Sequence, residues 1–394
     1  MIEIKEESQK IQKNIIKWRR DLHRIPEVGL ILPKTKSYIE DRLKEMDIET
    51  KEFNRCSGIA GLIKGEKRRN TVALRADMDA LPILEKTGLP FASTSNNMHA
   101  CGHDAHMAML LGAATLLKNH QNELDCNVKL IFQPGEEELG GAKIMIKEGV
   151  LKDPKVDTLL SLHIGNFFDG LKNGQVGISY GIMMASIDHF LVRVKGKGCH
   201  GATPYKGVDP ITLAAQVINA FQLIVSREIN ATRPAVISIC KLSSGSSYNV
   251  IPDYVEFEGT VRAIDKEIRK KIAKRMENII SSVTKAMRGD YEYKYFFGYP
   301  PVINDFEVTK SFDETARKIL GSEDIIELKE PTMVGEDISY YLEKIPGSFF
   351  FLASLPKGKV YPHHNSRFDI DEGVLWKGSA LLAQGALDLA KKWL

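Results

Sequence analysis

Strand-like and helix-like segments alternate along the first 180 residues, and this alternation restricts the possible folds more than any other feature. Strands are predicted at 59–63, 71–75, 128–133 and 158–163, and helices at about 5–25, 35–46, 104–119 and 141–149. Strands that are joined through helices are typical of a largely parallel sheet with helices on both faces. We therefore predict an α/β domain.

The pattern changes near residue 182. Between residues 190 and 297 the predicted order is β-α-β-β-α-β, which is that of a ferredoxin-like α+β sandwich. An apolar segment at 348–352 then again has the strand pattern seen in the first 180 residues. A chain of 394 residues is also longer than one core usually supports. We predict a discontinuous catalytic domain at 1–182 and 298–394, with an inserted domain at 183–297.

Charge and composition exclude several classes of partner. The net charge is only +3 and the basic residues are dispersed, which argues against nucleic acid. No apolar run approaches the roughly 18 residues that a membrane span needs. Five scattered cysteines and a charged start without a signal-peptide core indicate a reducing cytoplasm.

Residues 98–106 (MHACGHDAH) form the densest group of metal-ligand side chains in the chain. Cys101 and His103 stand where a loop meets a predicted apolar helix. Thiolate and imidazole together suit a divalent transition ion such as zinc, manganese, nickel or cobalt. One cluster does not complete a site, so further ligands must come from elsewhere.

Other polar residues follow the predicted strands of the first domain. They are Asp77 and Asp79, Glu136 and Glu137, His163, and the pair His363 and His364. Ligands of open α/β sheets bind at the carboxyl ends of strands, so these residues are predicted to meet at one edge. Each has a plainer interpretation: a buried apolar thiol for Cys101, a solvated acidic run, a core histidine or a surface loop. Their convergence favours a metal site.

Several motifs in order along the chain carry a family resemblance. They are 19–23 (RRDLH), 74–82 (LRADMDALP), 98–104 (MHACGHD), 132–137 (FQPGEE), 200–204 (HGATP), 249–252 (NVIP), 259–262 (GTVR) and 364–368 (HNSRF). With them the chain resembles the M20 metallopeptidase and amidohydrolase family. The nearest branch is that of N-acyl-amino-acid amidohydrolases, which includes hippurate hydrolases, auxin-conjugate hydrolases and N-acetyl-diaminopimelate deacetylases.

The resemblance implies a site for two divalent metal ions. Its implied ligands are Cys101, His103, Glu137, His163 and His364. Glu136 would be the general base for a metal-bound water, and Asp79 would orient ligands.

The resemblance also implies that the inserted domain is a lid and dimerisation domain, so that a homodimer or a higher homo-oligomer is expected. His200 would donate to the oxyanion, and Asn249 and Arg262 would hold the substrate. Without the family, Asn249 reads as a turn residue and Arg262 as an exposed strand residue.

The chain departs from the family pattern at Glu138 and Tyr205, where relatives often have a small residue and a histidine. These departures leave substrate preference open. The remaining histidines of interest are given structural or supporting roles: His23, His99, His106, His189 and His363.

We expect a metal-dependent amidohydrolase that cleaves N-acyl-amino acids, or a metallo-exopeptidase acting on short peptides at the same site. Two other hypotheses are a metal-free thiol hydrolase, with Cys101 as nucleophile and His103 as base, and a catalytically silent metal or amino-acid binding protein.

Overall fold

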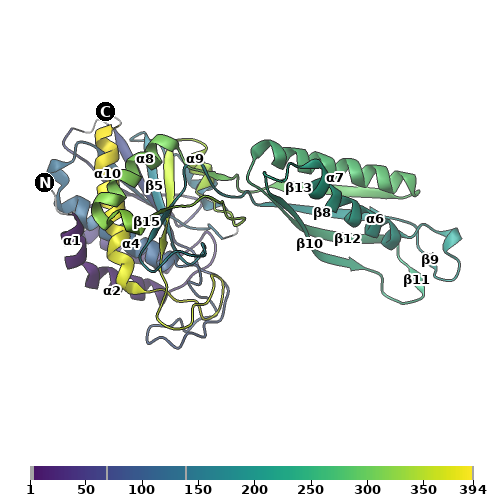
Figure 1. The fold of residues 1–394 in the computed structure, drawn as a ribbon. Helices are drawn as coiled ribbons and strands as arrows, with labels where there is room; N and C mark the ends of the chain where they lie inside the picture. Colours follow the sequence, from purple (N-terminus) through teal and green to yellow (C-terminus); the bar gives the residue numbers. More distant parts are fainter. Residues whose placement is uncertain (1–3, 68–69, 138–139, 393–394) are drawn as a thin grey trace. The chain divides into compact units, whose positions relative to one another are not determined.

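The computed structural model describes residues 4–67, 70–137 and 140–392 (Figure 1). Their contacts divide the chain into two compact units. Unit 1 comprises Met1–Met183, Ile303–Glu330 and Asp337–Leu394, and unit 2 comprises Met184–Val302 and Pro331–Glu336. Unit 2 is thus an insertion, and a short later segment of the chain returns to it.

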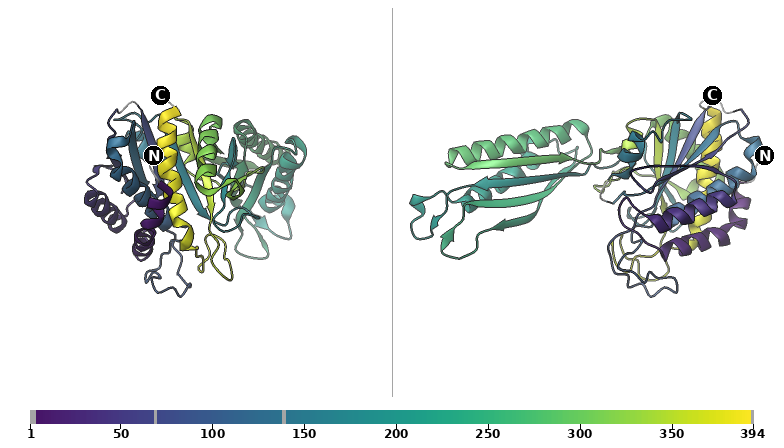
Figure 2. Two further views of the ribbon diagram at one scale, coloured as in Figure 1. Left: turned by 60° about the vertical axis from the view of Figure 1, so that its left-hand side comes forward. Right: turned by 180° about the vertical axis from the view of Figure 1, so that it is seen from behind.

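Unit 1 is built on an eight-stranded sheet of order β1-β2-β4-β3-β5-β16-β6-β15. The yellow C-terminal helix runs alongside the strands of this unit in both views of Figure 2. The strands are β1 (Glu49–Glu52), β2 (Ile59–Ile63), β3 (Thr71–Asp77), β4 (Asn127–Gln133), β5 (Thr158–Gly165), β6 (Val176–Ile178), β15 (Ile325–Glu327) and β16 (Gly347–Ala353). The central run β4-β3-β5-β16 is parallel, as is the pair β6-β15. The predicted α/β class with a mostly parallel sheet is confirmed.

Side chains alternate between two faces of this sheet, because successive residues of a strand point in opposite directions. Val72, Leu74 and Ala76 of β3 join the main apolar core, where α4 (His103–Asn119) and α10 (Leu375–Lys392) also pack. The intervening Arg75 and Asp77 are buried on the opposite face.

That opposite face is covered in part by α5 (Gly141–Lys147), which contacts β4 and the short α9 (Ser339–Leu342). It is the more polar side of the sheet. Its buried residues include Arg75, Asp77, Gln133, Ser161 and His163. The polar groups that matter for function therefore follow the strand register directly.

The other helices of unit 1 are α1 (Ile4–Lys10), α2 (Gln12–His23), α3 (Pro33–Glu45) and α8 (Phe306–Leu320). The single helix predicted over residues 5–25 is wrong, because the chain turns at Ile11 and forms two helices. The second ends at His23, in keeping with Pro26, which disfavours helical geometry at the residue before it. Strand β3 also continues two residues beyond its predicted end.

Unit 2 contains a four-stranded antiparallel sheet of order β10-β12-β8-β13. Its elements are β8 (Asp188–Lys195), α6 (Pro210–Leu223), β10 (Ala235–Ser244), β12 (Tyr254–Ala263), α7 (Lys266–Ala286) and β13 (Asp290–Phe297). This is the predicted ferredoxin-like order. Helix α6 ends at Leu223 and is followed by a short π-helical segment at Ile224–Glu228.

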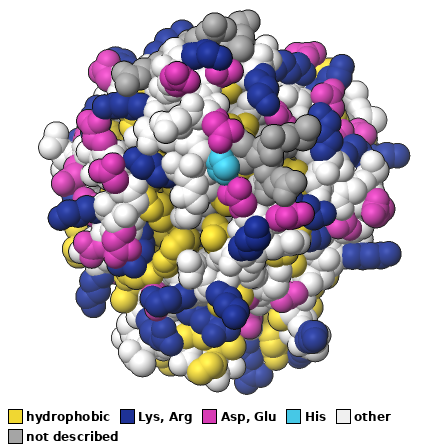
Figure 3. Space-filling model, turned by 90° about the vertical axis from the view of Figure 1, so that its left-hand side faces the viewer, with side chains coloured by type: hydrophobic (Ala, Val, Ile, Leu, Met, Phe, Trp, Pro, Cys, Tyr) yellow, Lys and Arg dark blue, Asp and Glu magenta, His cyan; other side chains and the backbone are white. Residues whose placement is uncertain are grey.

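Two properties of the surface bear on partners. No helix in the described ranges is both long and apolar enough to cross a membrane. On the face seen in Figure 3, basic and acidic side chains are interspersed instead of forming a patch of one sign.

Candidate metal centre

Cys101, His103 and His163 meet at the carboxyl ends of β3 and β5. Their ligand atoms lie within 4.8 Å of one another, and Cys101 Sγ is 3.5 Å from His163 Nε2. Gly102 separates Cys101 from His103 with a φ of 89°, a left-handed conformation that glycine adopts without strain. This turn places both neighbours at the start of α4. All three candidate ligand residues are buried.

Hydrogen bonds fix the ring orientation of both histidines. Nδ1 of His103 donates to the backbone carbonyl of Asp79 at 2.8 Å, and Nδ1 of His163 donates to the carbonyl of Ile164 at 2.9 Å. With Nδ1 donating, the lone pair of each ring in its neutral form lies on Nε2. Nε2 of His103 has no hydrogen-bond partner among the described residues. Histidines that bind metals are oriented in this way.

Glu137 and His364 also lie close to Cys101. His364 Nε2 is 3.3 Å from Glu137 Oε2, and these two residues form a second compact group with Cys101. His364 has a φ of 63°, an uncommon conformation for a residue other than glycine. Its backbone N–H donates to the carbonyl of Ala100, which ties this loop to the Cys101 loop.

Cys101 thus belongs to two groups of candidate ligands, one with His103 and His163 and one with Glu137 and His364. Two overlapping groups that share a sulfur fit a pair of ions better than a single one. Oε1 of Glu137 also lacks a hydrogen-bond partner within the described part of the chain, as expected of a carboxylate that completes a metal site.

The electrostatic field of the pocket is negative. Burial together with Glu137 and Glu136 raises the pKa of the Cys101 thiol well above its usual value. Burial alone would lower the pKa of His103, but Asp77, Asp79 and Glu137 raise it to about 10. Negative charge disfavours the thiolate of Cys101 and favours the protonated ring of His103, so it raises both pKa values. A bound divalent cation would offset that charge and allow Cys101 to ionise.

His163 is a neutral imidazole. Burial, aided by the neighbouring His106 and His363, lowers the pKa of His163 well below its usual value. A ring that remains unprotonated at neutral pH is the form that binds a metal.

Glu136 is buried beside the ligands and forms a compact group with His103 and Glu137. The carboxylate of Asp79 accepts the backbone N–H of Glu136 at 2.9 Å and that of Glu137 at 3.1 Å. Asp79 therefore holds the backbone of the 136–137 loop as well as the ring of His103. The adjoining Glu138 lies outside the described residues.

Three of the sequence-predicted site residues, His200, Asn249 and Arg262, belong to unit 2. His200 lies on β9 (Cys199–His200), which pairs with β11 (Val250–Ile251), and the carbonyl of Asn249 accepts the N–H of Gly201 at 2.8 Å. His200 and Asn249 are therefore neighbours. Nδ1 of His200 accepts the N–H of Ala202 at 3.0 Å, so the neutral ring carries its proton on Nε2.

Arg262 lies on β12 of the four-stranded sheet, whereas β9 and β11 form a separate two-stranded sheet. Its guanidinium is half-buried, and its Nη1 has no hydrogen-bond partner in the parts of the chain that the structure describes. Such a group is suited to binding a carboxylate. Tyr205 is exposed.

Sequence reasoning gave supporting roles to Asp79, His106 and His363, but it identified neither Asp337 nor the pairing of His106 with Asp77. Asp337 bonds to Arg75 and Gln133, and His106 bonds to Asp77. His106 and Asp77 stand inside the recognised motifs, but nothing in the sequence pairs them. Asp337 is 262 residues from Arg75, and no local pattern indicates that contact.

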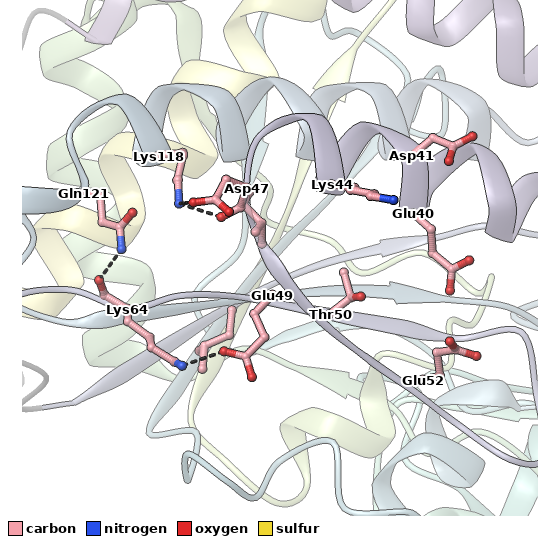
Figure 4. Close-up of a pocket in the computed structure, with 12 residues that line it drawn as sticks. Glu40, Asp41, Lys44, Asp47, Glu49, Thr50, Glu52, Lys64, Lys118 and Gln121 are labelled. Carbon is pink, nitrogen blue, oxygen red and sulfur yellow. Dashed lines mark hydrogen bonds and ion pairs between the residues drawn. The ribbon is translucent and has the colours of Figure 1, made fainter.

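A surface hollow of about 710 Å³ lies elsewhere on unit 1, lined by charged side chains of α3, β1 and α4 (Figure 4). Lys64 pairs with Glu49 at 2.5 Å, and Lys118 donates to the backbone carbonyl of Asp47 at 2.6 Å. It shares no residue with the candidate ligand groups. We assign no chemistry to it.

The fold and the candidate ligand groups are those of a metal-dependent hydrolase, with an α/β domain that carries the candidate ligands and an inserted α+β domain. More particularly, the chain belongs to the peptidase family M20/M25/M40, whose model matches residues 73–388.

Relatives of this family resemble the chain over nearly all of its length. It is 40% identical to the N-acetyl-L-cysteine deacetylase of Bacillus subtilis over 392 residues, which cover 98% of this chain and 92% of the relative. It is 38% identical to thermostable carboxypeptidase 1 of Saccharolobus solfataricus, over 99% of this chain and 98% of the relative. The Bacillus subtilis YXEP protein, described as a dinuclear metal-binding peptidase from family M20, superposes with a TM-score of 0.84 at 35% identity, covering 97% of this chain and 99% of that one.

Proposed function

We propose that this protein is a two-metal amidohydrolase that cleaves N-acyl-amino acids into a carboxylic acid and a free amino acid. The observation that carries the proposal is the shared position of Cys101 in two ligand groups, with a buried carboxylate, Glu136, beside them. Relatives named as a deacetylase and as a carboxypeptidase both hydrolyse amide bonds, which supports the reaction class.

The proposed ligands are Cys101, His103, Glu137, His163 and His364. Two bound divalent ions would polarise the scissile carbonyl and lower the pKa of water. Glu136 would take the proton from the attacking water and pass it to the leaving amine. Its backbone N–H is held by Asp79, so its carboxylate is presented from a fixed loop.

The proposed roles in unit 2 concern the substrate. The Nε2–H of His200 is a donor suited to an oxyanion, and the adjoining Asn249 would donate to the substrate amide or carbonyl. Arg262 would bind the carboxylate of the amino-acid part. By family resemblance unit 2 is proposed to act as a lid and as the contact of a homodimer, and the protein is proposed to be cytoplasmic.

The thiol-hydrolase alternative is disfavoured by the surroundings of Cys101. A nucleophilic cysteine needs a lowered pKa, but burial and carboxylates raise the pKa of this thiol. The imidazole in hydrogen-bond contact with its sulfur is that of His163, at 3.5 Å. The exopeptidase alternative uses the same residues, and only substrates distinguish it.

The test is hydrolysis of a panel of N-acetyl-, benzoyl- and long-acyl-amino acids, N-acetyl-diaminopimelate and simple dipeptides. Each is run with chelator and again with added manganese, zinc, cobalt or nickel. Metal-dependent release from an acyl-amino acid supports the proposal. Release from dipeptides alone would favour the exopeptidase, and activity that survives chelation would refute the metal mechanism.

A further inference from the structure

His106 lies one turn after His103 on α4 and is buried between two proposed ligands. Its ring centroid is 5.4 Å from that of His103 in a stacked arrangement, and 4.5 Å from that of His163 in an edge-on arrangement. A residue that is not itself a proposed ligand therefore packs against two that are.

Both ring nitrogens of His106 are committed to the protein. The N–H of Ile164 donates to its Nε2 at 2.9 Å, so this nitrogen carries no proton. Its Nδ1 then holds the proton and donates to Asp77 Oδ1 at 2.5 Å. Neither nitrogen is left for an ion, although Asp77, His103 and His106 are close enough to resemble a metal site.

The backbone of Ile164 connects His106 to His163. His106 binds its N–H, while its carbonyl accepts Nδ1–H of His163 at 2.9 Å and Nε2–H of His363 at 3.1 Å. The end of β5 is thus held by three imidazole rings. Movement of Ile164 would change the direction of the lone pair on His163 Nε2.

Asp77 is held in turn by a buried ionic chain. Arg75 Nη1 donates to Asp77 Oδ2 at 2.9 Å, and Arg75 Nη2 donates to Asp337 Oδ1 at 2.8 Å. Oδ2 of Asp337 also accepts Gln133 Nε2 at 2.8 Å and the N–H of Ala142 at 3.0 Å. The three charged side chains are fully buried, so removing one leaves an uncompensated buried charge.

We infer that His106 is a positioning residue for the metal centre, and that Asp77, Arg75 and Asp337 hold it in place. These four residues are called the positioning network. The inference rests on the proposed two-metal function, since orientation of His163 and His103 matters only if they bind ions. Groups that orient ligands typically change metal affinity by about 10- to 100-fold when they are removed.

The experiment is cobalt binding to the full chain, measured by competition with a chelator and by the visible absorption of bound Co²⁺. The variants are His106→Leu, His106→Asn and His106→Gln. Glutamine extends to the position of Nε2 and can accept the N–H of Ile164, whereas asparagine imitates only the Nδ1 contact with Asp77. We expect the affinity for Co²⁺ to fall by about 10- to 100-fold in His106→Leu, and the Co²⁺ spectrum to change. We expect His106→Gln to lose less affinity than His106→Leu, and His106→Asn to lose more than His106→Gln.

Asp337→Asn tests the far end of the network, because Asp337 is not a proposed ligand. We expect it to weaken cobalt binding by several-fold. The matched control is Asp188→Asn in unit 2, where the fully buried Asp188 pairs at 2.5 Å with Arg269, whose side chain is 11% exposed. That variant removes comparable ionic stabilisation but is expected to retain wild-type cobalt affinity and spectrum.

Wild-type affinity and spectrum in all His106 variants would overturn the inference. So would an equal loss in Asp188→Asn, which would indicate general destabilisation. If His106→Leu does not fold, the comparison of the glutamine and asparagine variants decides the question. Failure of the wild-type protein to bind cobalt would instead refute the two-metal function, and the inference with it.

Discussion

Oδ1 of Asp79 accepts the backbone N–H of Glu136 at 2.9 Å, so one buried carboxylate holds the segment that carries the proposed base. The same residue accepts the N–H of Glu137 and, through its carbonyl, Nδ1–H of His103. A single position thereby fixes the base and two proposed ligands relative to one another.

Asp79→Asn is expected to lower metal affinity or turnover by about 10- to 100-fold, because an amide NH₂ would face a backbone N–H. Chelator competition and steady-state kinetics measure both quantities. The control is Asp305→Asn, which changes an aspartate that accepts the N–H of Val308 at the start of α8. Asparagine caps a helix as well as aspartate does, so this control should behave as wild type.

Glu136→Gln is expected to lower kcat by about 10²- to 10⁴-fold while metal binding stays within a few-fold of wild type, because the amide cannot accept the proton. Glu137→Gln should instead weaken metal binding. Metal content and kcat are measured for each variant. The opposite pattern, with metal lost only in Glu136→Gln, would mean that the two glutamates exchange roles.

Metal binding is expected to raise the melting temperature by several degrees. Ions that bind only the folded chain stabilise it by about 2.7 kcal/mol per site when the free ion is at 100 times Kd. Thermal unfolding of metal-free protein with and without added Mn²⁺, Zn²⁺ or Co²⁺ measures the shift. Cys101→Ser lacks the shared sulfur and should gain less, and an equal gain would argue against that sharing.

Cys240 is expected to be the fast-reacting thiol of the native protein, because it is exposed. Cys126 is buried, and burial together with Asp125 raises its pKa to about 12, so the reactive thiolate is scarce at neutral pH. A disulfide reagent should give one rapid phase that disappears in Cys240→Ser, and all five thiols after unfolding. Rapid native labelling of Cys126 would contradict its burial.

Arg262→Lys is expected to raise KM by about 10- to 100-fold with little change in kcat, since a hydrogen bond to a charged group contributes about 1.5–3 kcal/mol. An ammonium cannot reproduce the two-pronged contact of a guanidinium with a carboxylate. Arg193→Lys is the control, because Arg193 lies on β8 of the same sheet and pairs with Glu256. A fall in kcat at unchanged KM would contradict a role in ground-state binding.

Most elements of the fold and the proposed ligands could be predicted from local patterns. Strand β2 has its predicted bounds, and β5 begins at its predicted first residue and extends two residues beyond its predicted end. Hydrophobic runs and helix periodicity are properties of neighbouring residues, and the carboxyl ends of parallel strands necessarily meet at one edge. The prediction that Glu137 and His163 approach one another depends only on these two facts, whereas the inclusion of Cys101 also depended on the 98–106 cluster and on the family resemblance.

The break of the first helix at Ile11 and the return of residues 331–336 to unit 2 were not predictable in this way. Such features depend on what packs against a segment, and the same local pattern suits either outcome.

The sequence by itself determined the order of the elements, the family, and which side chains are chemically able to bind metal ions. Only the tertiary structure decided which candidate ligands form each of the two groups around Cys101. It also decided that Nδ1 of His103 is used in a hydrogen bond and that Asp337 pairs with Arg75. The physical reason is that hydrogen-bond partners of buried groups are chosen by packing between distant segments. Burial makes those partners obligatory, but local sequence does not specify them.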